Sequence, residues 1–164
     1  MDKIKKIFVI EDSSILSRII ELQLRQEFNC ETTVFKNADD AMIVIKLSVP
    51  DLIVLDYIYN ERDRRYANGL EFLKELRKKY DVPVIVFSGQ SDKQKAIELI
   101  KEGANDYINK DDDDFMDDLL AATKDIFDMQ FAKKKIKSFR SKLKINFLFL
   151  GLLLFLSAVM LKYI

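Results

Sequence analysis

Polar residues that suit phosphoryl chemistry follow three short apolar runs of this sequence and one more polar segment. Glu11 and Asp12 follow the first run, Asp56, Ser88 and Lys110 the others. Carboxylates that come together raise one another's pKa unless a cation lies among them. Hard oxygen ligands without histidine or thiolate point to Mg²⁺. A carboxylate nucleophile, a divalent cation, a hydroxyl donor and an ammonium group are the parts that phosphoryl transfer to an aspartate requires.

Five short segments of the chain are predicted to be strands that position these residues. Three of them are continuous apolar runs, which is typical of strands buried on both faces of a parallel sheet. The other two are more polar and suit the edges of a sheet. Segments with helical spacing separate the strands, and Ser13 and Asn37 are predicted N-caps of two of these helices. The predicted strands are residues 7–10, 32–35, 52–55, 84–87 and 107–109.

This alternation of strands and helices predicts an α/β fold with an open, doubly wound, five-stranded parallel sheet. Apolar strands in the middle and polar strands at the edges favour the flavodoxin-like order 2-1-3-4-5. Ligands of such a sheet bind outside the carboxyl ends of the strands. A carboxylate, serine or lysine at a strand end is, taken singly, commonly a turn former or helix cap. The prediction of a site therefore depends on all of these residues lying at the same edge.

Composition excludes several other chemistries. The 164 residues include no histidine, so the chain has no Ser/His/Asp or Cys/His catalytic unit and cannot itself carry a phosphohistidine. The lone Cys30 forbids an intrachain disulfide. All 27 acidic residues lie at or before Asp128, whereas eight of the 27 basic residues follow it. The acidic part is therefore not expected to bind nucleic acid.

The end of the sequence predicts a membrane anchor. Residues 145–161 carry no charge, and residues 145–164 approach the length that a helix needs to cross a bilayer. Lysine and arginine are concentrated before this run, which predicts a single pass of the inner (cytoplasmic) membrane with the N-terminal part in the cytoplasm. The predicted organisation is a globular domain (1–128), a basic helical linker (129–144) and a transmembrane anchor (145–164).

An alternative for the tail is a buried C-terminal helix or an oligomerisation stripe. The helix that begins near Phe115 is expected to continue through the basic linker. Its apolar residues are spaced by four, three and four, which makes a coiled coil and a homodimer possible. These apolar residues are Ala132, Ile136, Phe139 and Leu143.

Four strings of this sequence, IFVIEDSS, LIVLDYI, PVIVFSGQ and GANDYINK, carry a resemblance to a known family. Over residues 3 to 128 the chain resembles the receiver domains of bacterial response regulators. The resemblance implies that Asp56 is the phosphoacceptor. It also implies that Glu11, Asp12, Asp56 and the backbone carbonyl of Ile58 hold Mg²⁺.

The same resemblance assigns three further residues and the partners. Ser88 would hydrogen-bond a phosphoryl oxygen, Lys110 would pair with the phosphoryl group, and Tyr107 matches the switch aromatic of the family. The phosphodonor would be a sensor histidine kinase or a phosphotransfer protein. The downstream partner is an unidentified protein, contacted by a face that changes on phosphorylation.

The sequence departs from the family's pattern at three places. Lys110 is followed by Asp111 instead of the usual proline. The segment 57–68 is longer than is typical, either as an ordinary exposed insertion or as a docking surface for a partner. Ile58 and Gln90 occupy positions that influence how long the aspartyl phosphate lasts. Because an isoleucine cannot orient an attacking water, slow self-dephosphorylation is expected.

The favoured interpretation is a membrane-tethered, single-receiver response regulator that is not an enzyme and whose output is a protein contact. One alternative is a pseudo-receiver that acts as an interaction module without being phosphorylated. A Mg²⁺-dependent phosphohydrolase is less favoured, because no second carboxylate stands two residues after Asp56 to serve as acid or base.

Overall fold

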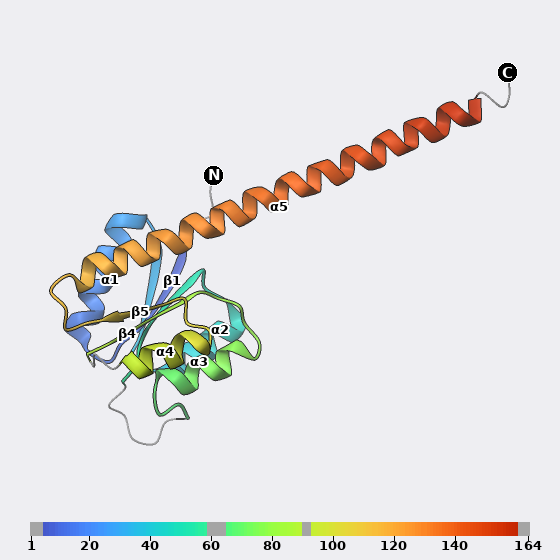
Figure 1. Cartoon of the computed structure of the whole chain (residues 1–164). Coiled ribbons are helices and arrows are strands. Elements are labelled where there is room, and N and C mark those ends of the chain that lie inside the picture. Colours follow the sequence, from blue (N-terminus) through green and yellow to red (C-terminus); the bar gives the residue numbers. More distant parts are fainter. Residues whose placement is uncertain (1–4, 59–64, 90–92, 161–164) are drawn as a thin grey trace. The chain divides into compact units, whose positions relative to one another are not determined.

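Strands and helices alternate along the chain in the computed structural model, which describes residues 5–58, 65–89 and 93–160 (Figure 1). Side chains of the last helix are described as far as residue 143. The strands are β1 (Lys6–Ile10), β2 (Glu31–Phe35), β3 (Leu52–Asp56), β4 (Val84–Ser88) and β5 (Asp106–Asn109). The helices are α1 (Ser14–Phe28), α2 (Ala38–Leu47), α3 (Gly69–Arg77), α4 (Lys93–Lys101) and α5 (Phe115–Met160).

The five strands form one parallel sheet in the order β2-β1-β3-β4-β5, which confirms the predicted flavodoxin-like fold. Every residue of β3 and β4 is buried, whereas the edge strands β2 and β5 each include exposed or half-buried residues. Helices α1 and the beginning of α5 cover one face of the sheet, and α2, α3 and α4 cover the other (Figure 1). Apolar strands therefore occupy the centre because both of their faces are covered.

Side-chain caps fix where three of the helices begin. Ser13 accepts a hydrogen bond from the amide of Leu16 at the start of α1, and Asn37 accepts one from the amide of Asp40 at the start of α2. Both N-caps are as predicted. Asn68 caps α3 in the same way, by accepting from the amide of Glu71. These bonds satisfy amides that have no partner inside the helix.

Helix α5 runs without a break from Phe115 to Met160, so the predicted continuation through the basic segment is confirmed. The chain divides into two compact units, Met1–Lys124 and Asp125–Ile164. The first contains the whole sheet, and the second consists of the remainder of α5 and the residues that follow it.

The predicted location at the inner membrane is wrong, and the structure does not support the predicted transmembrane anchor. Among the residues that the structure describes, none of the helices is both long and apolar enough to span a bilayer. The described side chains of α5 include six lysine or arginine residues between positions 133 and 142. Charge at this density excludes that part of the helix from hydrocarbon. The apolar run, residues 145–164, lies outside the residues whose side chains are described.

Arg77, the last residue of α3, joins the two segments that precede β4 and β5 at the amino-terminal side of the sheet. Its guanidinium donates to the carbonyls of Gly103 at 2.7 and 3.0 Å, of Val82 at 2.8 Å and of Tyr80 at 3.2 Å. Gly103 has a φ of 98°, which favours glycine, and an added Cβ there would lie 2.8 Å from Arg77 Nε. One side chain thus fixes the segments that lead into β4 and β5.

We expect Arg77→Met to lower the free energy of unfolding by about 1–3 kcal/mol, because it leaves partly buried carbonyls without their donor. Urea denaturation of the full chain measures the change. Lys78→Met is the matched control, since the Lys78 side chain is 67% exposed and makes an ion pair at the surface. Equal stability of the two variants would contradict the structural role of Arg77.

Candidate functional site

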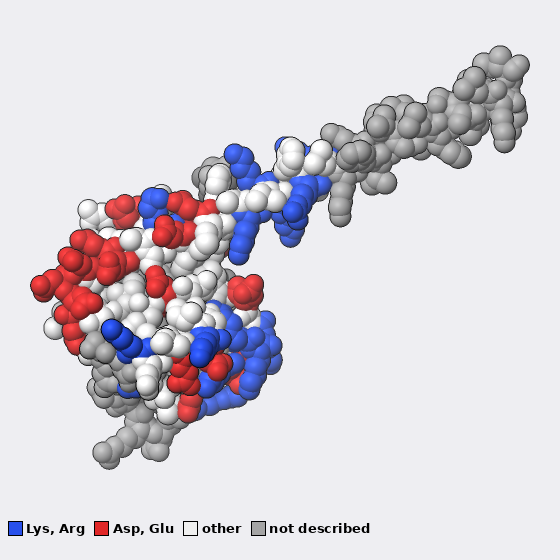
Figure 2. Space-filling view, viewed as in Figure 1, with Lys and Arg blue, Asp and Glu red and all other residues white. Residues whose placement is uncertain are grey.

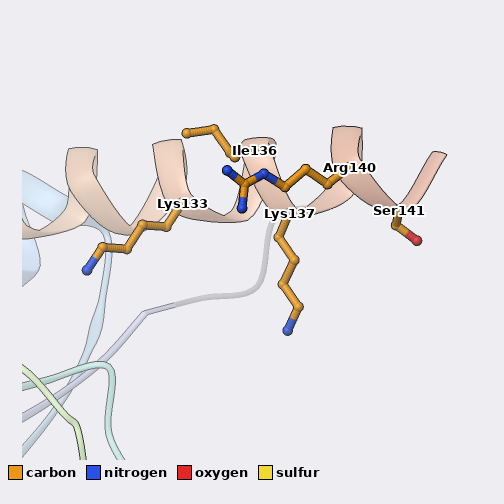
Figure 3. Close-up of a pocket in the computed structure, with 5 residues that line it drawn as sticks. All are labelled: Lys133, Ile136, Lys137, Arg140 and Ser141. Atoms are coloured by element: carbon orange, nitrogen blue, oxygen red, sulfur yellow. The ribbon is translucent and has the colours of Figure 1, made fainter. Parts of the chain in front are cut away.

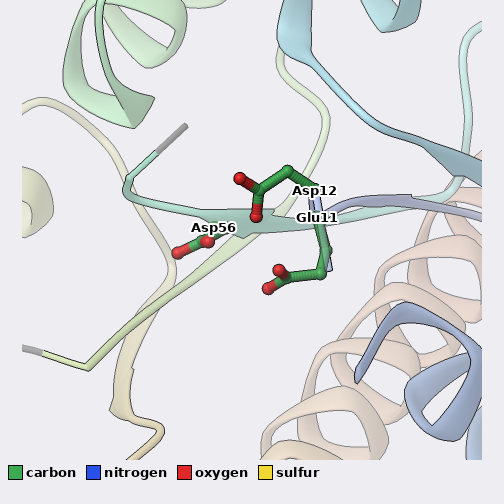
Figure 4. Close-up of side chains that lie close together, drawn as sticks. All are labelled: Glu11, Asp12 and Asp56. Carbon is green, nitrogen blue, oxygen red and sulfur yellow. The ribbon is translucent and has the colours of Figure 1, made fainter. Parts of the chain in front are cut away.

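Three carboxylates converge where β1 and β3 end. Glu11 and Asp12 directly follow β1, and Asp56 is the last residue of β3. The parallel register aligns Ile10 with Leu55, so the residues after them come side by side. One oxygen from each carboxylate lies within 4.8 Å of the other two (Figure 4). The structure therefore confirms that these three side chains converge, as predicted.

Lys110 reaches this cluster from the end of β5. Its ammonium lies 3.0 Å from Asp56 Oδ2 and 3.4 Å from Glu11 Oε2. The same group lies 5.3 Å from the centre of the Phe87 ring, a cation–π contact. The backbone amide of Lys110 donates to the carbonyl of Ser88 at 3.0 Å. One ammonium is thus shared by two acidic side chains.

Burial and mutual repulsion raise the pKa values of the two most buried carboxylates. Glu11 and Asp56 are each only 1% exposed. Burial, followed by the charge of Asp56, raises the pKa of Glu11 to about 7. Burial also raises the pKa of Asp56, although Lys110 opposes this shift. Without a further cation the cluster therefore holds a proton near neutral pH.

The same cluster stabilises the protonated form of Lys110. Burial opposes the charged form of Lys110, but the hydrogen bond to Asp56 and the charges of Asp56 and Glu11 outweigh it and raise the pKa of the lysine. Lys110 therefore keeps its positive charge at neutral pH.

Ser88, Tyr107 and Ile58 all lie near this edge of the sheet. Ser88 ends β4 and is buried, and it is aligned with Asn109, the residue before Lys110. Tyr107 is a half-buried residue of β5 that packs against the core. The amide of Ile58 donates to Asp56 Oδ1 at 3.3 Å. The structure thus brings Lys110 to the carboxylates and places Ser88 at the end of the neighbouring strand β4.

Three contacts at the site were not predicted from the sequence. The Phe87 ring lies against Lys110, the amide of Ser13 donates to Glu11 Oε1 at 2.8 Å, and Asp111 lies beside Gly89. An added Cβ at Gly89 would lie 3.1 Å from Asp111 Oδ1, so Asp111 occupies space next to β4. The sequence indicated these contacts only in that Phe87, Ser13 and Asp111 are each next to a predicted site residue. Gln90 and most of the long loop after Ile58 lie outside the described residues.

The donor set of this cluster fits a divalent cation. It consists of three carboxylates with hard oxygen atoms, and one ammonium does not balance their charge. A cation would favour the ionised form of both buried acids and so lower the pKa values that burial has raised. The cluster can therefore hold a metal ion.

The family of this chain follows from the match to known proteins. A family model, the response regulator receiver domain, matches residues 7–123. The chain belongs to this family. Receiver domains bind Mg²⁺ in an acidic pocket, and this receiver has an acidic cluster that could hold a metal ion. As a class, receiver domains are signalling modules of two-component systems and interact with histidine kinases or phosphotransfer proteins.

Individual relatives agree with this assignment. The receiver is 33% identical over 105 residues to the transcriptional regulatory protein KdpE of Staphylococcus aureus, a match that covers 64% of this chain and 43% of KdpE. The receiver domain of the Francisella response regulator 1452 is 27% identical, with a TM-score of 0.67 over 77% of this chain and 98% of that one. NtrX from Brucella abortus is 26% identical, with a TM-score of 0.71 over 83% of this chain and 29% of that one.

We expect divalent cations to bind this receiver more weakly as the pH falls. A raised pKa means that the folded protein holds a proton on Glu11 below about pH 7, and the cation must displace that proton. Titration calorimetry with Mg²⁺ is expected to give an affinity about tenfold lower at about pH 6 than at about pH 8. Glu11→Gln should weaken this pH dependence, whereas Asp118→Asn, an exposed acid on α5, should preserve it. An affinity that is constant over this range would contradict the assignment.

Proposed function

We propose that this receiver accepts a phosphoryl group on Asp56 from a sensor histidine kinase or a phosphotransfer protein. One observation carries the proposal. The buried carboxylate of Asp56 lies 3.0 Å from the ammonium of Lys110 and within 4.8 Å of two further carboxylates, at the sheet edge where ligands of this fold bind. This combination of a nucleophile, a fixed positive charge and a cation-binding cluster suits phosphoryl transfer to a carboxylate.

Asp56, Lys110 and Ser88 have separate roles in this transfer. An oxygen of Asp56 forms a bond to phosphorus while the bond between phosphorus and the donor's imidazole nitrogen breaks, and the electron pair of that bond stays on the imidazole. Lys110 moves from its ion pair with Asp56 to a phosphoryl oxygen, and the Ser88 hydroxyl donates to another. Because these groups are already positioned, little reorganisation is needed during the reaction.

In our proposal Glu11, Asp12, Asp56 and the backbone carbonyl of Ile58 hold Mg²⁺. The ion supplies positive charge that offsets the charge of the phosphoryl oxygens when it is bound. Glu11, the more deeply buried of the first two ligands, orients the site and acts through water. The amide of Ser13, which donates to Glu11 Oε1 at 2.8 Å, fixes the orientation of that carboxylate.

Phosphorylation would change the surface through Ser88 and Tyr107. The phosphoryl group adds a charge of about −1 to −2 at Asp56. Ser88 and Lys110 shift towards it, and the half-buried Tyr107 turns inward, so that the face formed by α4, β5 and the start of α5 is altered. The output is then a contact with another protein and not a catalysed reaction.

The end of the globular domain at residue 128 and the formation of a homodimer stay predictions.

We expect the full chain to take up one phosphoryl group from a small phosphodonor in the presence of Mg²⁺, and Asp56→Asn to take up none. Intact-mass spectrometry measures the uptake. Asp118→Asn is the control, because it removes an exposed acid outside the cluster. Incorporation that persists in Asp56→Asn would contradict the proposed acceptor. Failure of the unaltered chain with both small donors and histidine kinases would indicate a pseudo-receiver.

Lys110→Met is expected to slow this uptake by about 10- to 1000-fold, because the only described ammonium in contact with Asp56 is removed. The initial rate of mass gain, measured at saturating Mg²⁺, reports the effect. Lys101→Met, on the exposed side of α4, should react at the rate of the unaltered chain. A Lys110→Met rate within about threefold of that control would remove Lys110 from the mechanism.

We also expect the aspartyl phosphate to hydrolyse slowly, because Ile58 has an apolar side chain that cannot orient an attacking water. The half-life of the phosphorylated mass peak in Mg²⁺ buffer tests this expectation. Ile58→Gln, which introduces a side chain able to hydrogen-bond water, should shorten that half-life. Decay within seconds in the unaltered chain would contradict it.

A further inference from the structure

The described part of α5 beyond the first unit exposes apolar side chains. All residues from 131 to 143 are exposed. Among them, Ile136 is 53% exposed, Phe139 63% and Leu143 40%. Residues of this kind at helical spacing are normally buried against another element. This segment therefore presents exposed apolar side chains.

These apolar side chains form one stripe along the helix. Met129, Ala132, Ile136, Phe139 and Leu143 are spaced by three, four, three and four residues. This is the spacing that keeps side chains on the seam between two helices. At about 1.5 Å per residue, the stripe extends over about 20 Å, or four helical turns. It is therefore suited to pack along another helix.

Basic side chains flank the stripe on both sides. Lys133 and Arg140 occupy the flanking positions on one side, and Lys135 and Lys142 those on the other. Figure 2 shows lysine and arginine side chains along this part of the helix. In Figure 3, Lys133 and Lys137 extend to one side of the helix while Ile136 points another way. The five residues that it draws line a pocket, and all of them belong to α5.

The basic charges of residues 133–142 are not balanced within the segment. No acidic residue follows Asp128 in the sequence. Lys133 and Lys137 are four residues apart, and Lys137 and Arg140 are three apart, so like charges are neighbours on the helix surface and destabilise it. A binding partner that brings acidic groups beside the stripe would relieve this repulsion.

A second copy of the same segment does not meet this requirement. In a parallel pair the flanking positions of one side meet those of the other side, and in an antiparallel pair each side meets itself. Both arrangements place lysine and arginine opposite lysine and arginine. The repulsion disfavours a homodimer through the stripe and favours a partner with acidic flanks.

We propose that residues 129–143 are a docking surface for an acidic amphipathic helix of a partner protein. The apolar seam of that helix packs on Ile136, Phe139 and Leu143. Its aspartate or glutamate residues pair with the flanking lysines and Arg140. The inference does not depend on phosphorylation of Asp56, because the surface lies in the second unit of the chain.

Fluorescence anisotropy with a labelled peptide tests the proposal on the full chain. The probe is a three-heptad peptide, about 21 residues long, with isoleucine and leucine at the apolar positions and glutamate at both flanking positions. At about 0.15 M salt, which screens contacts beyond about 8 Å, the unaltered chain is expected to bind it. The double variant Lys135→Glu, Arg140→Glu should bind at least about tenfold more weakly and should instead bind a lysine-flanked peptide.

The double variant Lys134→Glu, Lys137→Glu is the matched control, because it changes the net charge equally but lies away from the flanks. Its affinity for the peptide should fall by less than about threefold. Phe139→Ser should abolish binding while circular dichroism shows that the helical content is unchanged.

Equal losses of peptide affinity in the two double variants would overturn the proposal in favour of general charge attraction. Tighter binding to phosphatidylserine vesicles or to duplex DNA than to the peptide would overturn it in favour of a lipid or nucleic-acid surface. A dimer in sedimentation equilibrium that Phe139→Ser dissociates would overturn it in favour of a second copy.

Discussion

Two carboxylates that are each only 1% exposed, Glu11 and Asp56, share a single ammonium group among the residues that the structure describes. Burying charge is costly unless it is paired, and one lysine balances only part of the charge of this cluster. The parallel register of β1 and β3 makes the proximity unavoidable, because both acids follow aligned residues of buried central strands. The site therefore favours a cation, and the phosphorylation that we propose for Asp56 depends on the same unbalanced charge.

Much of this arrangement follows from the order of residue types along the chain. Continuous apolar runs identified the central strands, and the polar character of residues 32–35 and 107–109 placed those strands at the edges. Once the order of the sheet is known, residues that follow its strands must meet at one edge. Glu11, Asp56 and Lys110 could thus be assigned to one site without knowing a single distance.

Other features depend on side-chain packing that the sequence does not encode locally. The contact of Lys110 with Phe87 requires the register of β4 and β5, and the bonds from Arg77 to Gly103 join segments 26 residues apart. The membrane prediction failed for a different reason. It rested on the apolar length of residues 145–164, whereas the described helices include none that can span a bilayer. The described part of the second unit instead presents an apolar stripe between basic side chains.

The most direct test of the central claim is the titration of the Glu11 and Asp56 carboxyl groups by carbon-detected NMR, with and without Mg²⁺. Without the ion, we expect the pKa of Glu11 to be about 7 and that of Asp56 to lie above its ordinary value. With the ion, both pKa values should fall by more than about one unit. Ordinary pKa values that Mg²⁺ leaves unchanged would show that the cluster has no unbalanced charge, and would contradict the account.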